Sequence, residues 1–328
     1  MTENLLELKN VTTEFKTDAG VFSAIKEVSF SVRKGETLCV VGESGSGKTI
    51  TSLSTMQLLP SNGKVISGEI YFKNNNLLTM SRKQISKIRG KSFAMIFQDP
   101  MSALDPVFTC GSQIVEAILV HKKASKKEAY DRTIQLLNQV KIPHPERVFH
   151  SYPHELSGGM CQRIVIAMAL SCDPELLIAD EPTTALDVTV QAQILNLLNQ
   201  IKEERNMGLV LITHDLGVVA EVADRVAVMY AGQVVEESDV NTIFHNPKHP
   251  YTRGLIKSVP KINQSTKELY SIKGAIPSIN EMPVGCRFNP RCELATELCR
   301  ETEPSLEQYD KKSLVRCWHV EKGGGHIG

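Results

Sequence analysis

The segment that most constrains how this chain can fold is a glycine-rich loop that runs from Gly42 to Thr49. It reads GESGSGKT and fits the pattern G-x-x-x-x-G-K-[ST]. An apolar run, Thr37–Val41, comes directly before it, and a helical pattern, Thr49–Leu59, follows it. A phosphate-binding loop requires this order of strand, loop and helix, so the sequence predicts a nucleotide-binding α/β fold.

The residue types in this loop fit the chemistry of a bound nucleoside triphosphate. Glycines let successive backbone N–H groups wrap around a β-phosphate at the positive end of a helix, where a side chain would not fit. We expect Lys48 to place its charge between the β- and γ-phosphates and Thr49 to offer its hydroxyl to Mg²⁺. The residues expected to line the phosphates are Gly42, Ser44, Gly45 and Gly47.

A second chemical feature is a pair of adjacent carboxylates, Asp180 and Glu181, at the end of the apolar run Leu176–Asp180. In a parallel sheet this strand end would lie beside the phosphate loop. Adjacent strand residues point to opposite faces, so the two carboxylates would have different surroundings. We expect Asp180 to hold Mg²⁺ and Glu181 to act as the general base for an attacking water.

Composition excludes several other classes of protein. The 328 residues include 37 Lys and Arg and 37 Asp and Glu, and 41% are apolar. A chain this apolar is not disordered, and without a basic surplus nucleic acid is not expected as its main partner. The longest apolar run, Ile164–Leu170, is far shorter than the roughly 20 residues that span a bilayer. The N-terminus lacks a signal-peptide pattern, which predicts a cytosolic protein.

The patterns along the chain predict two domains. Strand and helix patterns alternate over residues 5–236, as in a sheet covered by helices, and an inserted helical subdomain is expected at about residues 99–165. Residues 241–328 are rich in proline and poor in periodic runs, so we expect a nucleotide-binding domain of residues 1–240 and a small irregular C-terminal extension. The expected central strands are Glu36–Val41, Ser92–Gln98, Leu176–Asp180 and Leu209–Thr213, and the expected inserted helices are Gly111–Lys122 and Lys126–Val140.

Four further motifs make the sequence similar to the ATP-binding-cassette family, and they occur in that family's order. Leu156–Met160, which reads LSGGM, resembles the signature loop, and Ala185–Asp187 resembles the D-loop. Gln98 resembles the Q-loop glutamine, and His214 the switch histidine. The resemblance implies a P-loop NTPase cassette with a mixed central sheet that hydrolyses ATP. It also implies catalytic roles for Glu181, His214 and Gln98, and the magnesium ligands Thr49, Gln98 and Asp180.

The same resemblance implies that each ATP lies between two protomers. Adenine recognition calls for an aromatic ring upstream of the phosphate loop, because stacking needs little polar detail. Phe15 occupies the matching position, and Phe22 is the alternative. The residues that would act in trans, on ATP held by the partner, are Ser157, Gly158, Gly159 and Asp187.

Four of the eight cysteines lie in the C-terminal region, in the spacing C-x5-C-x6-C-x17-C. Four thiolates in the cytosol can hold an iron–sulfur cluster or zinc, although the short C-x2–4-C spacing typical of zinc is missing, and unligated thiols are the third possibility. The sequence around these cysteines, and HPYTRGL at residues 249–255, resemble the tails of ATPase subunits of oligopeptide and dipeptide importers. That resemblance implies a [4Fe–4S] cluster. The cysteines are Cys286, Cys292, Cys299 and Cys317.

The resemblance as a whole implies an ATP-binding and ATP-hydrolysing subunit of an importer for oligopeptides or dipeptides. Such a subunit would pair with a paralogous ATPase, with a homodimer still open, and would dock on two integral membrane permease subunits at the cytoplasmic face of the membrane. An extracytoplasmic binding protein would deliver the cargo. The alternatives are the same role for nickel or other small solutes, a soluble cassette ATPase, or a regulator that only binds nucleotide. A single phosphate loop, the lack of sustained heptads, and the presence of Glu181 and His214 favour the transporter subunit.

Overall fold

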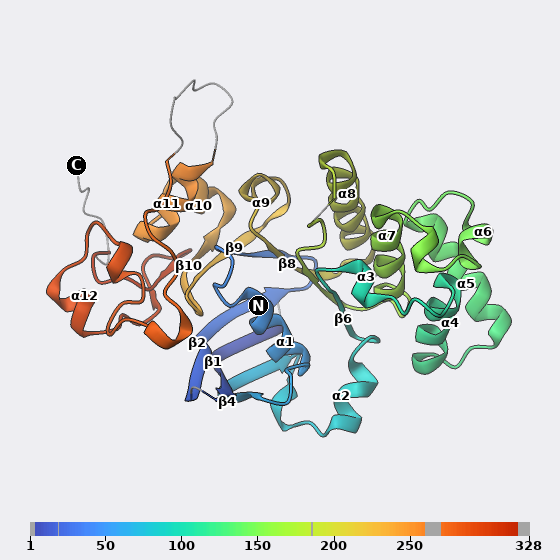
Figure 1. Cartoon of the computed structure of the whole chain (residues 1–328), viewed down its shortest axis with the longest axis horizontal. Helices are drawn as coiled ribbons and strands as arrows, with labels where there is room; N and C mark the ends of the chain where they lie inside the picture. The colour runs from blue at the N-terminus through green and yellow to red at the C-terminus, as the bar shows by residue number, and fades with distance from the viewer. Residues whose placement is uncertain (1–3, 19, 185, 260–269, 321–328) are drawn as a thin grey trace. The chain divides into compact units, whose positions relative to one another are not determined.

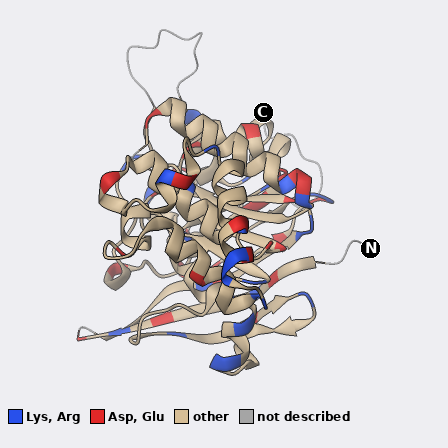
Figure 2. Cartoon of the chain, turned by 90° about the vertical axis from the view of Figure 1, so that its right-hand side faces the viewer, with Lys and Arg blue, Asp and Glu red and all other residues tan. Residues whose placement is uncertain are grey.

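Contacts between residues divide the computed structural model into two units, each assembled from segments that are distant in the sequence. The structure describes residues 4–18, 20–184, 186–259 and 270–320. In the cartoon of Figure 2, basic and acidic positions are interspersed along the chain, and the sequence contains equal numbers of the two. The first unit comprises Met1–Leu5, Val32–Glu36 and Thr79–Leu211, and the second comprises Leu6–Ser31, Thr37–Leu78 and Ile212–Gly328.

Parallel strands organise the first unit. Strand β6 (Phe93–Ile96) pairs in parallel with β7 (Leu176–Asp180), and Ile96 lies opposite Ala179. Every residue of both strands is buried, which explains why these segments read as continuous apolar runs. Strand β8 (Gly208–Thr213) follows β7 in the sheet, and its last two residues are grouped with the second unit. The strands begin and end within two residues of the predicted bounds.

The predicted helical subdomain is confirmed between β6 and β7. Helices α4 (Cys110–His121) and α5 (Lys126–Gln139) pack against each other and against α7 (Gly158–Ala169), as Figure 1 shows. Helix α5 starts at a capping box in which the side chains of Ser125 and Glu128 each accept a hydrogen bond from the other residue's backbone N–H. The other helices of this unit are α2 (Arg82–Ile88), α3 (Pro100–Ala103), α6 (Pro145–Phe149) and α8 (Val188–Arg205).

The second unit contains two sheets. The antiparallel sheet has the order β2-β1-β4-β5, and the other sheet has the order β11-β12-β10-β9-β3 within this unit. Strand β3 pairs in parallel with β9, whereas β9 pairs with β10 in the antiparallel sense, so the predicted mixed sheet is confirmed. The strands are β1 (Asn4–Thr17), β2 (Gly20–Arg33), β3 (Thr37–Val41), β4 (Gly63–Phe72), β5 (Asn75–Asn76), β9 (Arg225–Tyr230), β10 (Gln233–Asp239), β11 (Glu307–Gln308) and β12 (Leu314–Val315).

The C-terminal region adds strands to the mixed sheet of the second unit. Val315 of β12 pairs with Glu236 of β10, and Glu307 of β11 pairs with Val315 in turn. Between these short elements the chain is irregular, as the frequent prolines predict. The helices of the second unit are α1 (Lys48–Met56), α9 (Leu216–Val222), α10 (Val240–His245), α11 (Pro250–Ser258) and α12 (Glu297–Glu301).

Candidate nucleotide-binding site

The phosphate loop connects β3 to α1 in the second unit, as predicted, and its glycines meet neighbouring backbone and side chains closely. A Cβ atom on Gly42 would overlap the carbonyl oxygen of Met229, in β9. A Cβ on Gly47 would lie 2.8 Å from a methyl group of Ile25, in β2, and Gly47 also has a φ of +98°, which side chains disfavour. The loop therefore requires glycine at both positions because of its packing and its backbone conformation.

Lys48 is folded back over its own loop. Its side-chain Nζ donates hydrogen bonds to the carbonyl oxygens of Gly42, at 2.8 Å, and Glu43, at 3.0 Å, and only 6% of the residue is exposed. On the outer side of the loop, Ser44, Gly45 and Thr49 are exposed. Backbone N–H groups at the start of a helix favour a bound anion, so this open side can receive phosphate groups.

The carboxylate pair lies at the end of β7 in the first unit. Asp180 is 2% exposed, whereas Glu181 is partly exposed and has a left-handed φ of +45°. Glu181 Oε2 accepts a hydrogen bond from Gln98 Nε2 at 3.0 Å and another from Thr184 Oγ1 at 2.9 Å. The carboxylate is thus fixed by two donors, and its uncommon backbone conformation is of the kind that clusters at functional sites.

Strand register explains why Gln98 and Glu181 meet. Ile96 and Ala179 are opposite each other in the parallel pair β6–β7. Gln98 and Glu181 each follow two residues later, so both leave the sheet at the same edge, where ligand-binding groups collect in parallel sheets.

Two helix N-termini of the first unit lie next to each other. Ser157 caps α7 and accepts a hydrogen bond from Met160 N at 3.4 Å, and Asp187 caps α8 and accepts one from Val190 N at 2.9 Å. A Cβ on Gly159 would touch a methyl group of Val190 at 3.1 Å. Ser157, Gly158 and Asp187 are exposed, so both helix ends can approach an external anion. Ala185, in the predicted D-loop, lies outside the described residues.

The remaining predicted residues belong to the second unit. His214 is exposed and follows β8 directly. Phe15, in β1, lies opposite Gly63 of β4, where a Cβ would come within 2.8 Å of its ring. Phe15 and Phe22 are both partly exposed, so each ring presents a face on which a base can stack.

The predicted [4Fe–4S] cluster is wrong. Among the described residues, which include all four C-terminal cysteines, no three His, Cys, Asp or Glu side chains are grouped so that they could hold a metal ion. All eight cysteines are free thiols. The sulfur of Cys299 is instead within hydrogen-bonding distance of Thr296 Oγ1, at 3.4 Å, and of His319 Nε2, at 3.5 Å.

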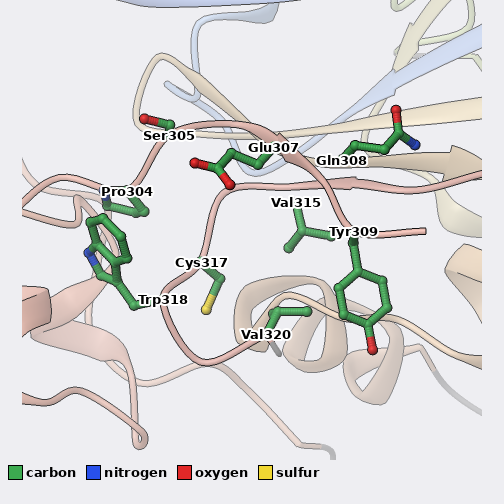
Figure 3. Close-up of a pocket in the computed structure, with 9 residues that line it drawn as sticks. All are labelled: Pro304, Ser305, Glu307, Gln308, Tyr309, Val315, Cys317, Trp318 and Val320. Atoms are coloured by element: carbon green, nitrogen blue, oxygen red, sulfur yellow. The ribbon is translucent and has the colours of Figure 1, made fainter. Parts of the chain in front are cut away.

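Burial raises the pKa of three of the four C-terminal thiols. Burial, with smaller contributions from the neighbouring thiols, raises the pKa of Cys286 and of Cys317 to about 11, and burial raises that of Cys292. Cys317 lines a pocket of about 270 Å³, and none of the other lining residues is a cysteine or histidine (Figure 3).

Sequence reasoning missed several residues around the site. Thr184 donates to Glu181, and a hydroxyl three residues after a carboxylate is a local signal that could have revealed it. Tyr251 and Arg291, of the C-terminal region, contact Glu43 in the phosphate loop. These two contacts join residues more than 200 positions apart, so no local pattern indicates them.

Comparisons with known proteins agree with the motifs and the fold. Residues 25–184 match the family described as "ABC transporter", and residues 235–299 match "Oligopeptide/dipeptide transporter, C-terminal region". The chain is 49% identical to the oligopeptide transport ATP-binding protein AppD of Bacillus subtilis (strain 168), over 98% of each chain. It is also 49% identical to the dipeptide transport ATP-binding protein DppD of Escherichia coli (strain K12), over 95% of this chain and 96% of that protein.

A solved structure extends the comparison to three dimensions. The dimeric structure of MJ0796, described as a bacterial ABC transporter cassette, is similar to this chain with a TM-score of 0.65 and 30% sequence identity. The similarity covers 72% of this chain and 98% of that one. The part of the mixed α/β fold that this similarity covers therefore has the fold of that cassette.

Proposed function

The chain belongs to the ABC transporter family of ATP-binding proteins, and from this premise we propose that it powers the import of oligopeptides or dipeptides. As a member of that family it binds and hydrolyses ATP. The observation that carries the proposed cargo is the similarity to peptide-transport proteins, which extends through the C-terminal region as well as the cassette. Peptide recognition itself would take place on other subunits.

We propose that the phosphate loop binds the triphosphate. Exposed Ser44 and Gly45 leave room for phosphate oxygens, and Lys48 would exchange its carbonyl partners for the β- and γ-phosphates. The loop residues proposed to surround the phosphates remain Gly42, Ser44, Gly45 and Gly47. Phe15 would stack on adenine, with Phe22 as the alternative ring.

Magnesium fits the chemistry of the donor groups present. The hydroxyl of Thr49, the amide oxygen of Gln98 and the carboxylate of Asp180 are the hard oxygen ligands that Mg²⁺ prefers. When bound, Mg²⁺ would neutralise charge on the phosphate oxygens. Asp180 is buried at the end of β7, which suits a fixed ligand better than a mobile base.

Hydrolysis is assigned to Glu181, with Gln98 and His214 in supporting roles. The hydrogen bonds from Gln98 and Thr184 to Glu181 Oε2 hold the carboxylate in place, and Glu181 would orient and deprotonate a water. His214, exposed after β8, would stabilise charge that develops on the γ-phosphate.

Ser157, Gly158, Gly159 and Asp187 are proposed to act on ATP held by a partner protomer. Their position at two exposed, adjacent helix N-termini supports this, because such ends favour anions. A dimer is supported by the similarity to a dimeric cassette. We propose that the partner is a paralogous ATPase subunit, and a homodimer is the alternative.

We further propose that the chain works at the cytoplasmic face of the membrane, on two permease subunits that receive cargo from a binding protein. No helix in the described part of the chain is long and apolar enough to cross a bilayer. Two of its relatives are transport ATP-binding proteins by name, which supports docking of this chain on such membrane subunits.

Reconstitution tests this function. The chain, its partner ATPase and the permeases are placed in lipid nanodiscs, and ATP hydrolysis is measured with the binding protein empty, loaded with an oligopeptide, or presented with nickel. We expect peptide to stimulate hydrolysis and Lys48→Ala to abolish it. Stimulation by nickel but not by peptide would identify an importer of small solutes. Hydrolysis that is insensitive to permeases and cargo would identify a soluble ATPase.

A further inference from the structure

Glu43, the second residue of the phosphate loop, is bound by a buried arginine of the C-terminal region. Arg291 Nη1 lies 3.1 Å from each of the two carboxylate oxygens of Glu43. The side chain of Arg291 is 5% exposed and that of Glu43 is 30% exposed. An ion pair with one partner buried is screened far less by water than a surface pair is.

Arg291 is itself held in place. Its Nε donates to the carbonyl oxygen of Lys273 at 2.9 Å, and its Nη2 donates to that of Ile272 at 3.3 Å. Its guanidinium carbon also lies 5.6 Å from the ring centroid of Tyr230, at the end of β9. All three guanidinium nitrogens therefore have partners, so the position of the guanidinium is fixed before it meets Glu43.

A second contact reaches the backbone of the same loop residue. Glu43 N–H donates a hydrogen bond to the hydroxyl of Tyr251, in α11, at 3.0 Å. Tyr251 is fully buried, and its ring centroid lies 4.7 Å from that of Tyr230 and 5.4 Å from that of Phe288. The hydroxyl is thus presented to the loop by a packed aromatic cluster and not by a mobile side chain.

Glu43 is consequently held at three points. Its N–H is bonded to Tyr251, its carboxylate to Arg291, and its carbonyl oxygen accepts from Lys48 Nζ at 3.0 Å. The two contacts from the C-terminal region therefore act on the residue that also positions the loop lysine. Without Arg291, the carboxylate of Glu43 would in addition leave a negative charge unpaired in a loop that binds a polyphosphate.

We propose that Arg291 and Tyr251 are positioning residues for MgATP, through which the C-terminal region sets the nucleotide affinity of the cassette. They hold the phosphate loop in its binding conformation, so MgATP binding does not have to order the loop. Arg291 also neutralises the Glu43 carboxylate, which would otherwise repel the phosphates and weaken binding. This inference rests on the proposed role of the phosphate loop. It assigns to the C-terminal region a task in nucleotide binding, separate from any contact with permeases.

The test measures the dissociation constant of MgATP for the full-length chain by calorimetry. Arg291→Gln removes a charge-assisted contact and leaves Glu43 charged, so it should weaken MgATP binding about tenfold. Tyr251→Phe, which keeps the ring, should weaken binding about threefold. The double variant Glu43→Gln with Arg291→Gln should bind more tightly than Arg291→Gln alone, because the unpaired carboxylate is gone. In hydrolysis assays KM should rise while kcat changes less than twofold.

Two further variants make the result interpretable. Arg300→Gln is the matched control, since Arg300 also belongs to the C-terminal region but has a side chain that is 59% exposed and pairs weakly with Glu297, at 4.0 Å. It should leave affinity unchanged. Lys48→Ala is the reference for the loop itself. If Lys48→Ala does not alter affinity, the proposed nucleotide site fails, whereas loss of binding in Lys48→Ala with normal binding in Arg291→Gln overturns only the present inference.

Other results also decide the question. The proposal would be overturned if the double variant bound MgATP no more tightly than Arg291→Gln alone. It would also be overturned if Arg300→Gln lost as much affinity as Arg291→Gln. A fall in kcat without a change in KM would overturn it as well. If Arg291→Gln does not fold, Arg291→Lys and Tyr251→Phe replace it. Arg291→Lys keeps the positive charge, so its affinity for MgATP should be within threefold of the wild type. Normal affinity in Tyr251→Phe together with a tenfold loss in Arg291→Lys would contradict the proposal.

Discussion

At the scale of single residues, Glu181 is held by one side chain that is distant in the sequence and by one that is three residues away. Gln98 and Thr184 both donate to Oε2, which fixes the plane of the carboxylate. A carboxylate held in this way can orient a water molecule. A general base must first be positioned within hydrogen-bonding distance of the water before it can accept a proton from it.

Glu181→Gln is therefore expected to stop hydrolysis without preventing MgATP binding. The amide keeps the shape of the side chain but cannot take a proton, and positioned general bases contribute roughly 10²–10⁴ in rate. Turnover is measured in the reconstituted complex and affinity by calorimetry. Glu203→Gln, an exposed residue of α8, is the control and should hydrolyse ATP normally. Near-normal turnover in Glu181→Gln would remove Glu181 from the mechanism.

At the scale of elements, the N-terminus of α7 depends on Ser157 for its cap and presents Gly158 to solvent. Apart from the neighbouring residues and the backbone of its own helix, no atom of the described residues comes within 4 Å of a Cβ placed on Gly158, so this helix end has open space for a ligand. If that ligand is the γ-phosphate of a partner's ATP, bulk at this end should affect dimerisation and not nucleotide binding by the isolated chain.

We predict that Ser157→Arg abolishes ATP-driven dimer formation and changes the nucleotide affinity of the single chain by less than about twofold, because the substituted helix end would contact only the partner's ATP. Light scattering and calorimetry measure the two quantities. Ser125→Arg removes another serine cap, that of α5, and controls for the loss of the cap alone. A loss of single-chain affinity as large as that of Lys48→Ala would mean that Ser157 contacts the nucleotide bound by its own chain.

Helix α11 gives the C-terminal region a dependence on pH. His249 caps this helix by accepting a hydrogen bond from Tyr251 N, and complete burial lowers its pKa to about 3. In the unfolded chain the imidazole titrates near pH 6.5. Between these values the unfolded state binds the extra proton, so the free energy of unfolding decreases as pH falls. Burial of Glu236 raises the pKa of its carboxyl and acts in the opposite direction.

The contribution of His249 is isolated by His249→Asn, which can still cap the helix but does not titrate. From pH 5.5 to 4.5, where the unfolded imidazole is almost fully protonated, the wild type should lose about 1.3 kcal/mol relative to this variant. Urea unfolding followed by the fluorescence of Trp318, the single tryptophan, reports on this region. The same pH slope in both proteins would show that His249 is not neutral in the native state.

At the scale of the whole molecule, hydrogen bonds within the second unit connect the C-terminal region to strands β2 and β10. Arg316 is 4% exposed and donates to the carbonyl oxygens of Val234 and Pro304, each at 3.1 Å, and of Glu27, at 3.3 Å. These bonds join strands β2 and β10 to the C-terminal region. The C-terminal region is therefore part of the fold of the unit that carries the phosphate loop.

Arg316→Met is predicted to lower the free energy of unfolding by about 3 kcal/mol, because three carbonyl oxygens lose a charged donor. Scanning calorimetry of the full-length chain measures the effect. Exposed Arg300→Met should change stability by less than about 0.5 kcal/mol. Equal melting temperatures for wild type and Arg316→Met would show that the buried guanidinium contributes nothing net.

The phosphate loop and the carboxylate at the end of a strand were predictable from the sequence alone. Each is a short contiguous run, and the local backbone order of strand, loop or helix start is enough to specify its chemistry. The parallel strands β6 and β7 were readable for the same reason, since burial on both faces produces apolar runs.

Which distant side chains meet became visible from the three-dimensional packing. The contacts of Glu181 with Gln98 and of Glu43 with Arg291 span 83 and 248 positions, and they follow from strand register and from the path of the C-terminal region. The four C-terminal cysteines show the converse, because the family resemblance implied a cluster that the described residues do not assemble. Separation along the chain does not fix distance in space once loops intervene, and packing of the whole unit supplies that information.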